Sequence, residues 1–327
     1  MNQNKSKLAI GLGATCSGCD MSIVDLAEKL ANIFKSFEIV FWPTAQDQKL
    51  EQLKNMPDGS IDVTLYHGSI ANTENSEMAK LLRKKSKVII AFGACATHGG
   101  IPGLANLTNT KSLFKTVYSD TQSTANQNMT VPLTKTELKG HTLTLPRKLD
   151  TVVLLNEIID VDYYLPGCPP ETTLVEKAVE TLTSGDLPPK GSVLAPERIL
   201  CDECARPRSE KKISKIHRHH EVNTDLEKCL LEQGVICMGI ATRAGCGAKC
   251  INANVPCRGC MGPTSKTLDQ AAKAVSSLAS IIGVEQEEQM TEEEAEKLID
   301  QIKDPLGILE MFTLPSSILR KSVRVGE

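Results

Sequence analysis

The sequence is poor in aromatic side chains, which make up 3% of its 327 residues and include a single tryptophan, Trp42. Proteins that bind single-stranded nucleic acid stack the bases on such side chains, so this scarcity argues against that function. The formal net charge of −3 also differs from the strong positive charge of nucleic-acid-binding domains. We therefore expect no nucleic-acid partner.

Long uncharged apolar runs are missing as well, and no stretch of about 18 such residues could span a bilayer. Residues 1–7 are polar and lead directly into the short apolar segment 8–10, without the pattern of a secretory signal. We therefore expect a cytoplasmic protein without membrane insertion. Thiols stay reduced in that compartment, which favours metal binding over disulfides for clustered cysteines.

The chain is rich in cysteine, and its twelve cysteines fall into three groups of four. The first cysteine group is Cys16, Cys19, Cys95 and Cys168; the second is Cys201, Cys204, Cys229 and Cys237; the third is Cys246, Cys250, Cys257 and Cys260. One 4Fe-4S cluster takes four cysteine thiolates. The grouping predicts three 4Fe-4S clusters, with all twelve cysteines as cofactor and metal ligands, in a chain that carries single electrons.

Residues 1–186 alternate strand-like and helix-like segments. Strands are expected at residues 7–13, 38–42, 61–67, 87–92, 152–155 and 161–165, and helices at 22–35, at 74–85 and from Pro169 onward. This alternation predicts an α/β domain with a parallel sheet covered by helices. Residues 187–327 begin with a proline-rich linker and hold eight cysteines. We expect them to form a smaller, irregular, mostly helical domain, with a late helix from a capping box at Thr291 and Glu294.

Each member of the first cysteine group follows a predicted strand. Ligands of open parallel sheets bind beyond the carboxyl ends of the strands, so the fold would bring these distant cysteines together. One alternative is that Cys95 and Cys168 are small buried apolar residues. Another is that Gly11-Leu12-Gly13 begins a dinucleotide-binding loop, although an isolated GxG is a weak signal.

The spacing of the later cysteine groups leaves the metal open. Cys201 and Cys204 form a CxxC pair, and the third group is dense along the chain, as in four-cysteine zinc sites. Ligand type alone does not separate zinc from a 4Fe-4S cluster. The dispersed first group is unlike a zinc finger, and three sites in one chain suit electron relay. These two points favour clusters.

A basic stretch lies between Cys204 and Cys229. Its members are Arg206, Arg208, Lys211, Lys212, Lys215, His217, Arg218, His219 and His220. One interpretation is an ordinary solvated face. The other is a surface that steers an acidic electron-transfer partner toward the second cysteine group.

Four motifs carry a resemblance to a known family. They are Cys16-Ser17-Gly18-Cys19, Gly93-Ala94-Cys95, Pro166-Gly167-Cys168-Pro169-Pro170 and Pro256-Cys257-Arg258-Gly259-Cys260. Over residues 8–265 the chain resembles the small subunit of nickel-iron hydrogenases, and most of all the gamma subunit of the cytosolic methyl-viologen-reducing enzymes. The resemblance implies a flavodoxin-like domain at residues 1–186, with the proximal cluster on the first cysteine group. It implies an iron-sulfur domain at residues 187–327, with the medial cluster on the third group and the distal cluster on the second.

The resemblance also implies partners. In that family the nickel-iron site lies in a separate large subunit, so this chain would conduct electrons and hold no catalytic residue. A small iron-sulfur delta subunit and, in methanogens, heterodisulfide reductase would receive the electrons. Cys201 stands where many respiratory relatives carry histidine, and Cys250 where many carry proline. Both changes add thiolate charge, so lower cluster potentials are expected.

Two alternatives remain open. The related small subunit of respiratory complex I characteristically has two adjacent cysteines, whereas Cys16 and Cys19 are separated by two residues. A stand-alone multi-cluster electron carrier would lack a nickel-bearing partner.

Overall fold

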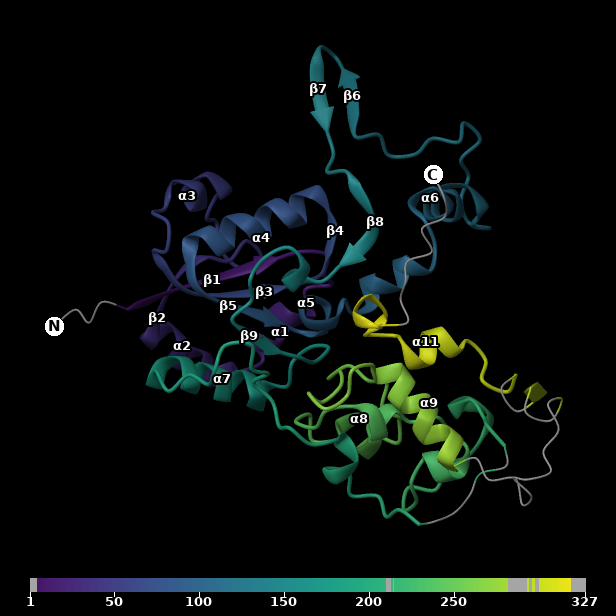
Figure 1. Ribbon diagram of the computed structural model, residues 1–327. Coiled ribbons are helices and arrows are strands. Elements are labelled where there is room, and N and C mark those ends of the chain that lie inside the picture. The colour runs from purple at the N-terminus through teal and green to yellow at the C-terminus, as the bar shows by residue number, and fades with distance from the viewer. Residues whose placement is uncertain are drawn as a thin grey trace.

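The protein is built around a parallel sheet. The computed structural model describes residues 5–209, 213, 215–281, 293, 296–297 and 300–318. The sheet has the strands β1 (Ser6–Leu12), β2 (Phe37–Phe41), β3 (Ile61–His67), β5 (Ser86–Phe92) and β9 (Tyr163–Leu165). Their spatial order is β2-β1-β3-β5-β9, and every pair is parallel (Figure 1). Among these strands the order is 2-1-3-4-5, that of flavodoxin-like sheets, so the predicted α/β class is confirmed.

Helices cover both faces of this sheet because successive strand residues point to opposite sides. In β1, Leu8 and Ile10 belong to one hydrophobic core and Ala9 to the other. The first core is closed by α1 (Gly18–Val24), α2 (Leu30–Ser36) and α7 (Thr172–Ser184), and the second by α3 (Leu50–Asn55) and α4 (Thr73–Lys85). Figure 1 shows α4 and α7 on opposite sides of the sheet.

The strand predicted at residues 152–155 does not join the central sheet. β8 (Lys148–Val153) pairs antiparallel with the short β4 (Ile70–Asn72), and the chain then turns because Leu155 enters the second core. Before β8, β6 (Lys135–Leu138) and β7 (His141–Thr144) form a hairpin that stands away from the body (Figure 1). All residues of both strands are exposed, so no buried apolar pattern marked them in the sequence.

Two predicted helices differ from the structure. The helix expected at residues 22–35 is interrupted: α1 ends at Val24, and α2 begins only at Leu30. Between them Ala27 has a φ of 51°, a left-handed conformation that a continuous right-handed helix does not contain. The helix expected from Pro169 begins at Thr172, because Glu171 before it is still extended.

The C-terminal part consists of short helices around a separate hydrophobic core. Its α-helices with described bounds are α8 (Lys249–Asn252), α9 (Gln270–Ile281) and α11 (Pro305–Leu309). Residues 191–194, expected as linker, hydrogen-bond alongside β9 and extend the sheet edge. The helix expected from Thr291 and Glu294 lies outside the described residues. Within the described part of the chain, no helix is both long and apolar enough to cross a bilayer.

Candidate metal centres

The first cysteine group gathers at the carboxyl ends of β1, β5 and β9. Two members lie in the loop and helix after β1, one lies in α5 (Ala94–His98) after β5, and one directly follows β9. The N–H of Gly93 donates to Leu165 O, and the N–H of Ala94 donates to Gly167 O, both at 2.7 Å. These bonds join the loops after β5 and β9, so the parallel sheet holds the distant cysteines side by side.

The four thiols of this group are close enough for their charges to interact. Burial raises the pKa of the Cys19 thiol far above its usual value, and the charges of Cys95, Cys168 and Cys16 raise it further. Burial and the charges of Cys168 and Cys16 likewise raise the pKa of Cys95 to about 12. Thiolate ligands must lose their protons, and a bound metal group supplies the positive charge that permits this. Four converging thiols with these properties fit a 4Fe-4S cluster.

Glycines bring the backbone close to the sulfurs. A Cβ on Gly93 would lie 2.4 Å from Cys19 Sγ, and one on Gly100 would lie 2.5 Å from Cys95 Sγ. Gly93 also has φ 87° and ψ 162°, a combination almost restricted to glycine. Cys19 and Cys95 are buried, whereas Cys16 and Cys168 are exposed, so the site is open on one side.

A buried polar network supports this site and was not predicted from the sequence. Asp20 accepts hydrogen bonds from Trp42 Nε1 at 2.7 Å, from the Thr44 hydroxyl at 3.0 Å and from His67 Nε2 at 3.2 Å. Burial alone would raise the pKa of Asp20, but these hydrogen bonds lower it. The network fixes the start of α1 beside Cys19. The lone tryptophan at the end of β2 was its one signal in the sequence.

The third cysteine group lies around α8 and touches the first. Burial raises the pKa of Cys260 to about 12, and the charges of Cys246, Cys168 and Cys250 contribute, although a hydrogen bond with the Cys168 backbone lowers it. Cys168 belongs to the first group, so these two groups are neighbours in space. The structure thus brings together cysteines from the end of β9 and from the region around α8.

The second cysteine group forms a site of its own beside the third. Burial and the charges of the other three members raise the pKa of Cys201 to about 12, whereas Arg208 lowers it. The sulfurs of Cys201 and Cys237 lie 3.5 and 3.7 Å from the position of a Cβ on Gly239. The N–H of Cys257, a member of the third group, donates to Cys237 Sγ at 3.4 Å. The third group therefore lies between the first and the second.

Within the described residues, no three His, Cys, Asp or Glu side chains are placed to hold one metal ion. A zinc ion draws four sulfurs to about 2.3 Å from a single centre. A 4Fe-4S cluster takes its four thiolates on different irons, so its ligands stand farther apart. The spacing of the three cysteine groups fits clusters better than single zinc ions.

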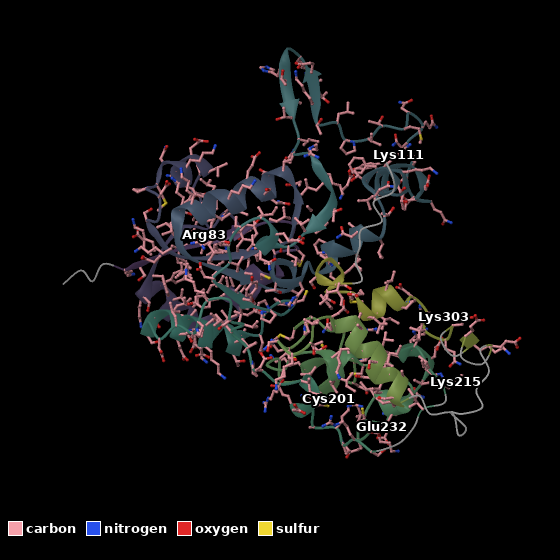
Figure 2. The ribbon with its side chains drawn as sticks, viewed as in Figure 1. Arg83, Lys111, Cys201, Lys215, Glu232 and Lys303 are labelled. Carbon is pink, nitrogen blue, oxygen red and sulfur yellow. The ribbon has the colours of Figure 1, made fainter. Side chains whose placement is uncertain are left out.

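The basic stretch does not form one continuous surface. Arg206 donates to the backbone carbonyls of Asp225, Lys228 and Ile251, so it holds loops together. A cavity of about 390 Å³ is lined by other cationic or histidine side chains: His217, Arg218, His219, His220, Arg258 and Lys303. Lys215 and Lys303 lie on the same side of this part in Figure 2. Lys211 and Lys212 lie outside the described residues.

The glycines of the weak GxG signal have a packing role. A Cβ on Gly11 would lie 2.2 Å from Leu82 Cδ1 of α4, and one on Gly13 would lie 2.5 Å from Ser69 O. These close approaches explain the glycines without a bound dinucleotide.

Together these features define the iron-sulfur subunit of an oxidoreductase complex. Residues 16–182 match the family described as "NADH ubiquinone oxidoreductase, 20 Kd subunit". A similar protein is the iron-sulfur subunit of the F420-non-reducing hydrogenase of Archaeoglobus profundus, 41% identical over 97% of this chain and 98% of that protein. A vhu subunit of the F420-non-reducing hydrogenase of Methanocaldococcus jannaschii is 38% identical over 94% and 95%. Among solved structures, a chain of an NAD+-reducing NiFe-hydrogenase matches with TM-score 0.48 and 30% identity, over 55% of this chain and 92% of that chain.

The chain belongs to the NADH ubiquinone oxidoreductase 20 Kd subunit family and, within it, to the small subunits of hydrogenases. The predicted resemblance to hydrogenase small subunits is confirmed at this level, and the chain is a component of an oxidoreductase complex.

Proposed function

We propose that this chain is the electron-conducting small subunit of a cytoplasmic nickel-iron hydrogenase of the methyl-viologen-reducing kind. Its twelve cysteines would hold three 4Fe-4S clusters. When bound, each cluster can accept and release one electron. Residues 1–186 would carry the proximal cluster, and residues 187–327 the medial and distal clusters.

The observation that carries this proposal is the spatial order of the three cysteine groups. Cys168 and Cys260 link the first group to the third, and Cys237 and Cys257 link the second group to the third. The order first, third, second supports the assignment of these groups as proximal, medial and distal. Such a row gives an electron a series of short transfers in place of one long one.

The partners follow from the two ends of this row. The large subunit with the nickel-iron site would dock over the first cysteine group, where Cys16 and Cys168 are exposed. A delta subunit, followed by heterodisulfide reductase, would receive electrons beyond the second group. Cationic side chains around the nearby cavity, among them Arg218 and Lys303, suit an acidic acceptor.

Iron and nickel analysis of the anaerobically purified complex tests this proposal. We expect about twelve irons on this chain, beyond those of its partners, by the four-per-cluster rule. We also expect nickel in a co-purifying chain. About eight irons would overturn the three-cluster assignment. A chain that purifies with its iron but without nickel would instead support a complex I-like subunit or a stand-alone carrier.

A further inference from the structure

The C-terminal segment of the described chain grips the backbone directly behind the first cysteine group. We call residues 309–318 the C-terminal tie. The N–H of Gly100 donates to Phe312 O at 3.0 Å. Pro315 packs against two glycines, since a Cβ on Gly99 or on Gly103 would lie 2.2 Å from Pro315 Cγ. On its other side, Gly100 is the glycine whose Cβ position lies 2.5 Å from Cys95 Sγ.

The same segment also holds the backbone of the third cysteine group. The hydroxyl of Thr313 donates to Gln270 Oε1 at 3.2 Å. Gln270 Nε2 in turn donates to Gly259 O at 3.1 Å, and Gly259 lies between Cys257 and Cys260. A Cβ on Gly259 would lie 3.1 Å from this amide, so the contact is close. One short segment thus connects the loops of two ligand groups.

The end of the tie is anchored as firmly as its middle. The Ser317 hydroxyl and the Ile318 N–H both donate to Asp269 Oδ2, at 2.6 and 2.9 Å. Asp269 directly precedes Gln270 at the start of α9. Five side chains of the tie are between 2% and 9% exposed: Leu309, Glu310, Phe312, Thr313 and Leu314. Burial and directed hydrogen bonds together give the segment one position.

We propose that the C-terminal tie sets the spacing between the first and third cysteine groups, and with it the rate of electron transfer between the clusters that they hold. This inference rests on the proposed function. Each transfer moves one electron, so oxidation at the first group is balanced by reduction at the third. Phe312, Thr313 and Pro315 act as positioning residues, since none of them is a ligand.

Gly103→Ala is the variant that tests the tie. Gly103 lies in a 3-10 helix (Ile101–Leu107) and has no positive φ, so alanine suits its backbone. The new methyl group would occupy the place of the Pro315 ring and force the tie away. The double variant Gly103→Ala/Pro315→Ala removes that ring and makes room for the methyl group. Leu107→Ala, at a position 47% exposed on the same helix, is the matched control.

Two readouts on the purified complex report on the tie. The first is hydrogen-deuterium exchange at the Gly100 amide, whose bond to Phe312 is part of the tie. Overpacking typically shifts such local equilibria by about tenfold or more, and we expect that acceleration in Gly103→Ala. The second is the magnetic interaction between the reduced clusters, measured by electron paramagnetic resonance. We expect it to change in Gly103→Ala and to return toward wild type in the double variant.

The outcomes separate this inference from the proposed function. Faster exchange with an unchanged magnetic interaction would overturn the spacing role, and unchanged exchange would overturn the tie itself. A double variant that behaves like Gly103→Ala would also count against the tie, because the contact with Pro315 would then not be the cause. Wild-type complex without cluster signals would overturn the proposed function and this inference together.

Discussion

Gly93→Ala should remove the first cluster, and the structure gives the size of the effect. The new Cβ would lie 2.4 Å from Cys19 Sγ, so the sulfur must leave its position. Overpacking of this kind costs about 1–3 kcal/mol. The conformation of Gly93, with φ 87° and ψ 162°, costs another residue about 1–3 kcal/mol. The sum of about 2–6 kcal/mol is a large share of a typical stability of about 5–15 kcal/mol.

Iron analysis of the purified complex measures the loss. We expect the iron on this chain to fall from about twelve to about eight, by the four-per-cluster rule, while the spectra of the other two clusters persist. Gly191→Ala is the matched control, because Gly191 also has φ 87° but has nothing within 4 Å of its Cβ position. It keeps the backbone strain and omits the clash. Full iron and an unchanged first-cluster spectrum in Gly93→Ala would refute the reasoning.

Four further predictions follow from the same structure. Cys95→Ala should abolish hydrogen-dependent dye reduction and leave the other clusters detectable; retained activity would argue against a proximal role. Cys250→Pro should convert the third site to a three-iron cluster, visible by electron paramagnetic resonance in the oxidised protein, and no such signal would mean that Cys250 is not a ligand. Burial alone would raise the pKa of Asp162, but its bonds to two cationic side chains and a backbone N–H lower it, so Asp162→Asn should lose about 2–3 kcal/mol in denaturation at pH 6. That deficit should shrink below pH about 4, because a lowered folded-state pKa stabilises only above the unfolded value; a constant deficit would contradict the ion pairs. Reversing Arg218 and Lys303 to glutamate should slow reduction of an acidic acceptor at low salt only, whereas equal slowing at high salt would exclude steering.

The sheet and the first cysteine group were predictable because their signals are local. β3 has the predicted bounds, Ile61–His67, since a strand buried on both faces is a short apolar run. Once the strands are parallel, residues that directly follow them meet at one edge. Cys16, Cys95 and Cys168 therefore converge without any further information from the sequence.

Other features depend on contacts that no local pattern encodes. The break at Ala27 changes a helix whose apolar spacing continues through it: Ile23 and Ile33, on either side, enter the same core. The β6–β7 hairpin is exposed throughout, so neither of its strands has a buried face that the sequence could reveal. The network at Asp20 assembles residues from four separate segments, and only the completed sheet brings them together.

The C-terminal tie shows why the role of the chain beyond residue 265 could not be predicted. Pro315 reads in the sequence as an ordinary turn residue, and Gly99 and Gly103 as flexible positions after Cys95. Their shared meaning appears only when they touch, because the glycines leave room for the proline ring. A metal centre made from ligands far apart in the chain needs such a distant contact, since each ligand loop is fixed locally but their separation is not. The order of the cysteine groups in space, which differs from their order in sequence, is therefore set by a contact between two non-ligand segments.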